Sequence, residues 1–175
     1  QEKVHAQAWV IGPGRGTDRE AAAELRAVLE RGLPTIIDAD ALTVLSTYGD
    51  LRDLVRDHPC AVLTPHAGEF ERLYKATLGR KLDLSEGLGI RLQELASALD
   101  CFVLHKGRIT TVTAPGQEIY GMNAGHSYAA TAGSGDVLSG ILGATLAQLN
   151  FAEVDAKGII AEILHAAAIH QHAAA

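Results

Sequence analysis

Four short apolar segments each run into a cluster of glycine or polar residues, and this pattern restricts the fold more than any other feature. The segments are residues 8–11, 35–37, 61–63 and 102–104. The clusters after them read Gly-Pro-Gly at 12–14, Asp-Ala-Asp at 38–40, Thr-Pro-His at 64–66 and His-Lys-Gly at 105–107. Helical patterns lie between them at 17–31, 68–75 and 86–99, an alternation typical of a parallel α/β sheet. Any one cluster also suits an ordinary loop, but four at the carboxyl ends of parallel strands predict a small-molecule site.

The remaining chain completes one domain over residues 1–175. Residues 109–113 and 119–122 flank a Pro-Gly turn and predict an antiparallel hairpin, and two helices are expected at 136–149 and 154–170. The first helix is expected to start in a capping box of Thr17 and Glu20 and to end before Gly32. We therefore expect a mainly parallel sheet with helices on both faces. Because the chain opens without a methionine or a first helix, this domain is expected to be N-terminally incomplete.

Composition excludes several classes of partner. The net charge of −6 argues against nucleic acid or an anionic membrane as the main partner. No apolar run approaches the roughly 20 residues of a membrane span, and no signal peptide is evident, so a cytoplasmic protein is expected. Cys60 and Cys101 each stand at the start of an apolar run and are expected to be buried free thiols.

The segment Thr-Ala-Gly-Ser-Gly-Asp-Val-Leu-Ser-Gly at 131–140 carries the strongest chemical signal. A glycine-rich turn that opens a helix directs backbone N–H groups, including those of Gly133 and Gly135, at one point, where the helix dipole favours an anion. A carboxylate at the same place, Asp136, would repel a phosphate unless it takes part in chemistry. Two interpretations stay open here: Asp136 is a general base beside a phosphate, or it is the N-cap of the helix.

In this order, the motifs at 12–14, 38–42, 64–69, 106–110 and 130–140 resemble the ADP-dependent NAD(P)H-hydrate dehydratases, repair enzymes of the ribokinase-like superfamily. The resemblance extends over essentially the whole chain, and family members have a longer N-terminal part that nothing here matches. It implies conversion of NADHX or NADPHX, in which water has added to the nicotinamide ring, back to NADH or NADPH. ADP is consumed in this reaction, and AMP and phosphate are formed.

The resemblance also implies the roles of particular residues. Asp136 is the expected catalytic base, and the substrate-binding residues are expected to be Gly14, His66 and Asp136. The adenine-nucleotide site is expected to comprise Lys106, Gly107, Arg108, Ile109, Thr110, Gly133 and Gly135. Mg²⁺ is expected to bridge the phosphates, although no cluster of carboxylates indicates protein ligands for it.

Several assignments stay open. Asp38 and Asp40 would contact substrate or order their loop, and Glu69 would cap a helix or act directly. His165, His170 and His172 lack a carboxylate at ligand spacing and are expected to form a solvated helix end rather than a metal site. An ATP-dependent small-molecule kinase and a noncatalytic nucleotide-binding protein are the alternative functions. The sequence does not decide between NADHX and NADPHX, between ADP and ATP, or between a monomer and a homo-oligomer.

Overall fold

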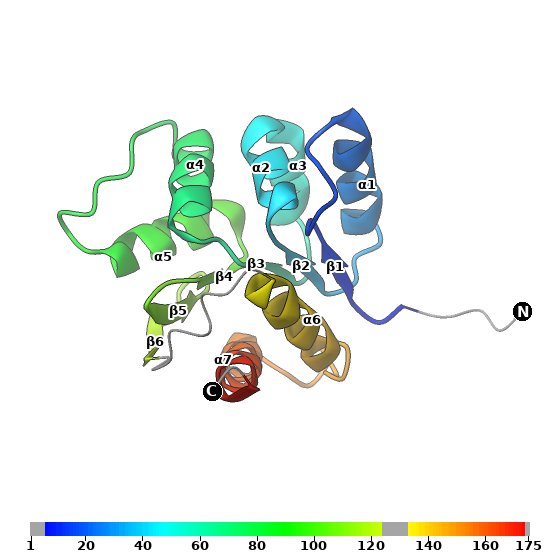
Figure 1. Ribbon diagram of the computed structural model, residues 1–175, viewed down its shortest axis with the longest axis vertical. Helices are drawn as coiled ribbons and strands as arrows, with labels where there is room; N and C mark the ends of the chain where they lie inside the picture. Colours follow the sequence, from blue (N-terminus) through cyan, green and yellow to red (C-terminus); the bar gives the residue numbers. More distant parts are fainter. Residues whose placement is uncertain (1–5, 124–132, 174–175) are drawn as a thin grey trace, which may run out of the picture.

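The computed structural model describes residues 6–123 and 133–173, which fold around one mixed sheet (Figure 1). The sheet order within these residues is β1-β2-β3-β4-β5-β6. The parallel strands are β1 (Trp9–Ile11), β2 (Thr35–Ile37), β3 (Ala61–Leu63) and β4 (Phe102–His105). The strands β5 (Ile109–Thr113) and β6 (Tyr120–Asn123) continue the sheet in antiparallel pairing. The predicted parallel sheet and hairpin are both confirmed.

Helices cover both faces of this sheet, as predicted (Figure 1). One face carries α1 (Arg19–Leu29), α2 (Asp40–Thr47), α3 (Gly49–Arg56), α4 (Ala67–Leu78) and α5 (Leu88–Leu99). The other face carries α6 (Ser134–Leu146) and α7 (Ala156–Ala173). Among the described residues, no helix has the length and apolar character needed to cross a bilayer.

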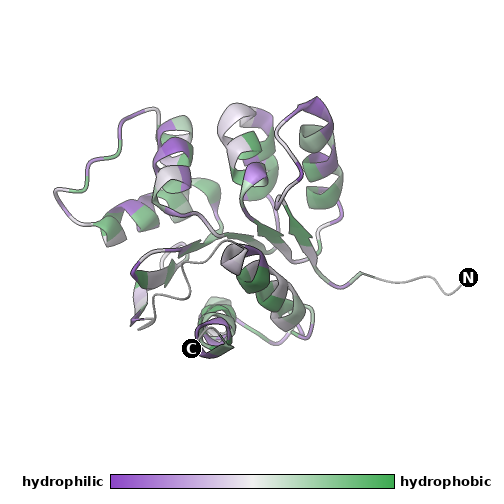
Figure 2. Cartoon of the chain, in the orientation of Figure 1, coloured by the Kyte–Doolittle hydropathy of each residue, from purple (hydrophilic) through white to green (hydrophobic). Residues whose placement is uncertain are grey.

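Alternation along the strands divides the interior into two cores. Successive residues of a strand point to opposite faces, so Ile37 packs with α1–α5 whereas the adjacent Ile36 packs with α6 and α7. Val103 and Leu104 divide in the same way. Since both faces are covered, β2 and β3 are buried at every position, and Figure 2 shows the central strands in the colour of hydrophobic residues.

Both cysteines lie in this interior as free thiols, as predicted. Burial raises the pKa of Cys60 to about 12, and it raises the pKa of Cys101 as well. A thiol with a raised pKa carries little of the nucleophilic thiolate form, so these side chains act as small apolar groups.

The ends of the predicted helices differ from those of the structure by up to three residues, and two short helices were not predicted. The N-cap of α1 is Asp18, whose side chain accepts from the Ala21 N–H at 2.8 Å, so the expected capping box at Thr17 was wrong by one residue. The sequence did not predict α2 and α3 at all. Neither helix has a side-chain cap hydrogen bond, because their N-cap positions are Ala39 and Tyr48. The usual sequence signal for a helix start is therefore missing.

Gly12 sets the close approach of β1 and β2 at the point where both strands end. Its φ is +126°, and a Cβ built on it would lie 1.8 Å from the Asp38 carbonyl oxygen. We expect Gly12→Ala to lower the free energy of unfolding by about 3–5 kcal/mol. The backbone at Asp38 would have to shift to make room for the new Cβ, and the alanine would be held at a positive φ. Urea unfolding would measure the loss. Gly16→Ala is the matched control, with a φ of +81° and nothing within 4 Å of its Cβ, and should cost only about 1 kcal/mol. Equal losses in the two variants would contradict the prediction.

Candidate functional site

The carboxyl ends of the four parallel strands form a continuous rim. The register extends one step beyond the strands, since the Asp38 N–H donates to Ile11 O at 3.1 Å and the Thr64 N–H to Ile37 O at 3.2 Å. Lys106 N–H donates to Pro65 O at 2.8 Å, and Lys106 forms a parallel bridge with His66. Asp38, His66 and Lys106 therefore follow neighbouring strands at one edge, as expected from sequence, with Gly14 in the loop after β1.

A buried carboxylate lies at the centre of this rim. The Asp38 side chain is 1% exposed, and the Lys106 Nζ donates to its Oδ1 at 2.6 Å. The Ser139 hydroxyl, on α6, donates to the other oxygen, Oδ2, at 2.7 Å. Asp38 also accepts from the Ala39 N–H at 2.8 Å. One carboxylate thus joins the ends of β2 and β4 to α6, and the sequence analysis gave Ser139, which lies within the 131–140 motif, no role of its own.

The two aspartates of the 38–40 cluster have different structural roles. Asp40 Oδ2 accepts from the Gly16 N–H at 2.8 Å and so orders the loop that contains Gly14. Between the aspartates, Ala39 has a φ of +48°, an unfavourable backbone conformation for a residue with a side chain. Gly14 itself has a φ of +65° with open space beside its Cα, as both a turn and a close approach to a ligand require.

The glycine-rich turn presents the first turn of α6 to the rim. Gly133 is the N-cap with a φ of +85°, and Ser134 begins the helix. Asp136 lies exposed in the first turn rather than at the N-cap, so the capping interpretation of Asp136 does not apply. A Cβ on Gly135 would lie 3.5 Å from the Lys106 Nζ. The cation of Lys106 and the positive end of the α6 dipole are therefore adjacent. Ala132, also expected in the anion-binding turn, lies outside the described residues.

His66 and Glu69 form the capping box of α4. The His66 Nδ1 accepts from the Gly68 N–H at 3.1 Å, and Glu69 Oε2 accepts from the His66 N–H at 2.9 Å. A Glu69 oxygen also lies 3.3 Å from His66 Nε2. Glu69 is thus a helix cap, one of its two expected roles. The His66 side chain is 57% exposed, so the outer edge of its ring is accessible to a ligand although both ring nitrogens contact groups of α4.

The segment from Lys106 to Thr110 turns from β4 into β5. Gly107, Arg108 and Ile109 are exposed, whereas Thr110 is buried. The Gln171 side chain, near the end of α7, donates to Thr110 Oγ1 at 3.4 Å. The exposed part of the segment is accessible to a nucleotide, and the buried part is fixed by α7.

One expectation about the C-terminal histidines was wrong. His165 and His172 are exposed, but His170 is only 8% exposed and its Nε2 lies 2.8 Å from the Ser134 Oγ. This contact joins α7 to the first residue of α6. Its partners are 36 residues apart in the sequence, and no motif in the sequence joins them.

Among residues 6–123 and 133–173, no group of three or more His, Cys, Asp or Glu side chains is arranged to hold a metal ion. Asp38, the most buried carboxylate of the rim, already accepts from Ala39, Lys106 and Ser139. The described residues therefore do not fit a dedicated metal site.

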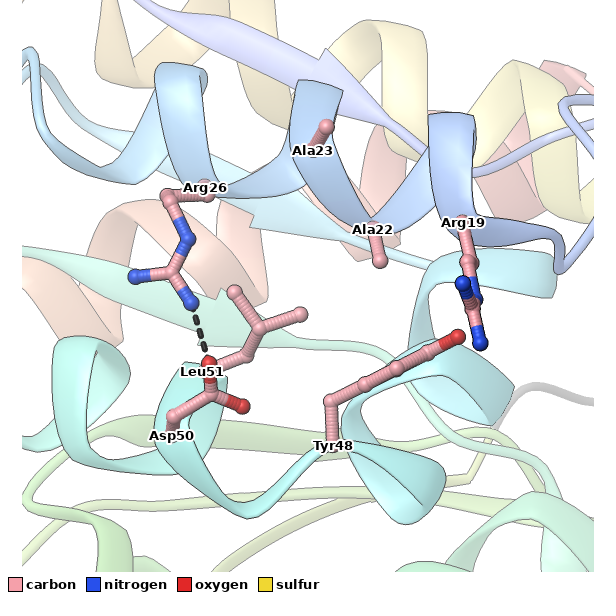
Figure 3. Close-up of a pocket in the computed structure, with 7 residues that line it drawn as sticks. All are labelled: Arg19, Ala22, Ala23, Arg26, Tyr48, Asp50 and Leu51. Atoms are coloured by element: carbon pink, nitrogen blue, oxygen red, sulfur yellow. Dashed lines mark hydrogen bonds and ion pairs between the residues drawn. The ribbon is translucent and has the colours of Figure 1, made fainter.

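A separate pocket of about 280 Å³ lies between α1 and α3 and contains no rim residue (Figure 3). Its polar walls come from Arg19 and Arg26 on one side and from Tyr48 and Asp50 on the other. Because the Arg26 guanidinium is paired with Asp50, that charge is already neutralised. The polar rim is accordingly the stronger candidate site.

Comparison with solved structures identifies the fold class. A ribokinase-like superfamily protein from Enterococcus faecalis matches with a TM-score of 0.73 at 27% identity, covering 95% of this chain and 54% of that one. An ADP/ATP-dependent NAD(P)H-hydrate dehydratase from Bacillus subtilis, co-crystallised with ATP and Mg²⁺, matches with a TM-score of 0.71 at 24% identity and the same coverage. The fold of this chain is therefore that of a ribokinase-like α/β protein.

Sequence comparison then identifies the family. The sequence model described as NAD(P)H-hydrate dehydratase matches residues 1–175, and the chain belongs to this family. A bifunctional NAD(P)H-hydrate repair enzyme from Mycobacterium tuberculosis is 49% identical over 141 residues, 81% of this chain and 28% of the relative. An ADP-dependent (S)-NAD(P)H-hydrate dehydratase from Neisseria meningitidis is 39% identical over 143 residues, 81% and 47% respectively. The chain thus spans between about a quarter and a half of the length of these relatives.

Two substitutions test the contribution of His66 as the N-cap of α4. His66→Ala removes the acceptor for the first N–H groups of α4 and should lower the free energy of unfolding by about 1 kcal/mol. His66→Asn supplies another good N-cap and should retain most of that stability. Urea unfolding of both variants measures the difference. Equal destabilisation of both would show that the cap is not what His66 contributes to stability.

A buried histidine beneath the rim should make stability depend on pH. His105 is 5% exposed and packs edge-on against Phe70, and its Nδ1 has no partner among the described residues. Burial lowers the pKa of His105 from its ordinary value, and the nearby His66 lowers it further. Burial likewise lowers the pKa of His58. The folded protein therefore takes up these protons less readily than the unfolded chain does.

The sign of the effect follows from these lowered pKa values. The contribution of these neutral histidines to stability should be fully present above the unfolded-state pKa of about 6.5. It should be lost as the pH falls toward their lower pKa values in the folded protein. We expect the free energy of unfolding, measured in urea, to decrease between about pH 7 and pH 5. His105→Phe should make this decrease shallower, and His172→Phe, at an exposed position, is the matched control. An unchanged slope in His105→Phe would contradict the assignment.

Proposed function

We propose that this chain forms the nucleotide- and substrate-binding part of an ADP-dependent NAD(P)H-hydrate dehydratase. The observation that carries the proposal is the position of the Lys106 ammonium beside the first turn of α6, with Gly135 leaving the space between them open. A cation and a helix N-terminus directed at one place suit a phosphoryl group. Family membership supplies the reaction: loss of water from a hydrated nicotinamide ring, driven by a nucleoside diphosphate.

The reaction needs phosphoryl transfer because hydroxide is a poor leaving group and phosphate is a good one. The hydroxyl oxygen of NADHX or NADPHX attacks the terminal phosphorus of ADP, and the bond from that phosphorus to the bridging oxygen breaks, which releases AMP. Asp136 takes the hydroxyl proton. Phosphate then leaves with the electron pair of the ring C–O bond, and loss of a proton from the neighbouring carbon restores the dihydronicotinamide.

The remaining residues bind and orient the reactants. Backbone N–H groups of the turn around Gly133 and Gly135 stabilise the phosphoryl charge, which is the main contribution in such transfers. The exposed residues of the segment from Lys106 to Thr110 contact the adenosine part. Gly14 and the outer edge of His66 contact the nicotinamide substrate. Mg²⁺, present with ATP in the crystals of the Bacillus subtilis protein, would arrive on the nucleotide phosphates and neutralise part of their charge.

Incubation of the full-length protein with hydrated NADH, ADP and Mg²⁺ tests the function directly. The absorbance of the dihydronicotinamide should rise, and AMP and phosphate should appear in equal amounts. ATP in place of ADP separates this activity from that of a kinase of the same fold, which would release a stable phosphorylated product. No recovery of NADH with either nucleotide, by a folded protein that binds them, would refute the proposed function.

Asp136→Asn tests the general base. The amide cannot accept the hydroxyl proton, so turnover should fall roughly 10²–10⁴-fold. Asp136 is exposed within the first helical turn, so stability should change by less than about 1 kcal/mol, the value of a charge at a helix terminus. ADP affinity should hold or rise, because one negative charge beside the phosphates is removed.

The matched control is Asp155→Asn at the start of α7, where Asp155 Oδ1 accepts from the Gly158 N–H at 2.9 Å. This variant should retain turnover, since it changes a carboxylate at another helix start away from the rim. Steady-state kinetics and urea unfolding of both variants provide the comparison. Near-normal turnover in folded Asp136→Asn would contradict the proposed mechanism.

A further inference from the structure

The Asp38 side chain is buried and is not directly accessible to a ligand. Asp38 therefore contributes to the site only through the groups that donate hydrogen bonds to it. Its side chain is 1% exposed, and both oxygens accept hydrogen bonds, Oδ1 from Lys106 and from the Ala39 N–H, and Oδ2 from Ser139. A buried carboxylate with several donors is well satisfied and has no need to bind a cation from solution. Asp38 therefore orients neighbouring polar groups and does not itself bind a cation.

The group it holds toward solvent is the Lys106 ammonium. The Lys106 side chain is 22% exposed, so the cation lies at the boundary between the buried carboxylate and the open rim. An ammonium has three N–H donors, and the contact with Asp38 uses one of them. The absent side chain of Gly135 leaves the Lys106 Nζ 3.5 Å from where a Cβ would be, directly beside the first turn of α6.

Ser139 and Lys106 donate to opposite oxygens of the Asp38 carboxylate. The Ser139 hydroxyl occupies Oδ2 at 2.7 Å, and the ammonium is bound to Oδ1 at 2.6 Å. Ser139 is fully buried within the same helix that begins at the glycine-rich turn. If this hydroxyl were removed, Oδ2 would lose a donor, and the ammonium would move to bridge both oxygens, since an unsatisfied buried acceptor is costly.

We propose that Asp38 and Ser139 are positioning residues that fix the Lys106 ammonium at the N-terminus of α6, where it binds the terminal phosphate of a nucleoside diphosphate. The proposal rests on the proposed function and adds two residues to it. Ser139 acts only through Lys106 and touches no reactant. The consequence is selective: loss of Ser139 weakens binding of the phosphate groups and leaves binding of the nucleoside unchanged.

The test compares ADP with adenosine, which lacks every phosphate, on the full-length protein by titration calorimetry. In Ser139→Ala the dissociation constant for ADP should rise roughly fivefold to tenfold, the net value of about one ordinary hydrogen bond. The dissociation constant for adenosine should stay within about twofold, so the ratio of the two constants changes. In kinetics, the KM for ADP should rise while the KM for hydrated NADH does not.

Three further variants make the result specific. Ser139→Thr keeps the hydroxyl and should restore the ratio of ADP to adenosine affinity. Ser46→Ala, which removes a hydroxyl donating to Leu42 O at 2.8 Å within α2, controls for loss of a helical serine away from the rim. In an Asp38→Asn/Lys106→Met background, in which the ion pair is removed as a unit, Ser139→Ala should have no further effect on the ratio.

Three outcomes would overturn the positioning proposal. The first two are an unchanged ratio of ADP to adenosine affinity in folded Ser139→Ala and an equal loss of both affinities, which a purely structural role produces. A persistent effect of Ser139→Ala in the background without the ion pair would overturn it as well. The proposed function fails separately, if the unaltered protein binds ADP in preference to adenosine but does not regenerate NADH. A changed ratio in Ser139→Ala, absent in the background without the ion pair, would establish the positioning role in either case.

Discussion

The ion pair of Asp38 and Lys106 is the interaction on which the arrangement of the rim depends. It joins β2 to β4 across β3, and the hydroxyl of Ser139 extends the connection to α6 on the other face of the sheet. The partners are 68 and 101 residues apart in sequence, so the pair forms only when the whole sheet is assembled. Buried ion pairs seldom add net stability, because desolvation offsets the attraction. The ion pair of Asp38 and Lys106 instead fixes the position of the Lys106 ammonium at the rim.

Close packing around this pair explains why small residues gather there. Gly12 brings the end of β1 against the Asp38 carbonyl, and Gly135 lets the first turn of α6 approach the Lys106 ammonium. Ala39 has a left-handed φ beside them, strain that the surrounding contacts maintain. Each of these features is unfavourable for an isolated chain segment. Together they place backbone N–H groups and one ammonium around the same space, which is what binding of a phosphoryl group requires.

Sequence reasoning located the sheet because its signals are local. Each parallel strand is a short apolar run that ends in a polar or glycine cluster, and the order of these clusters along the chain gave the rim. The helices α2 and α3 were missed because their N-caps, Ala39 and Tyr48, carry no capping side chain. The burial of His170 was missed for another reason. His170 continues the helical spacing of Ile159, Ile163 and Ala166 on the buried face of α7, but its polar partner, Ser134, belongs to a different helix, so a histidine among alanines was interpreted as solvated.

The candidate site shows the same limit of sequence-based prediction, because local motifs do not reveal contacts between distant residues. Asp136, Lys106 and the glycines of the turn belong to motifs, and motifs report residues that contact a ligand. Asp38 and Ser139 also lie within motifs, but Asp38 stayed ambiguous and Ser139 received no role, because a residue that orients another residue is recognised only by a distance. Two more such contacts converge on the rim: His170 on Ser134, and Gln171 on Thr110. Both come from the last turns of α7, so this helix supports the start of α6 and the start of β5 together. The geometry of the proposed nucleotide site is therefore supported by residues in the last turns of α7 that contact the site-forming segments from behind.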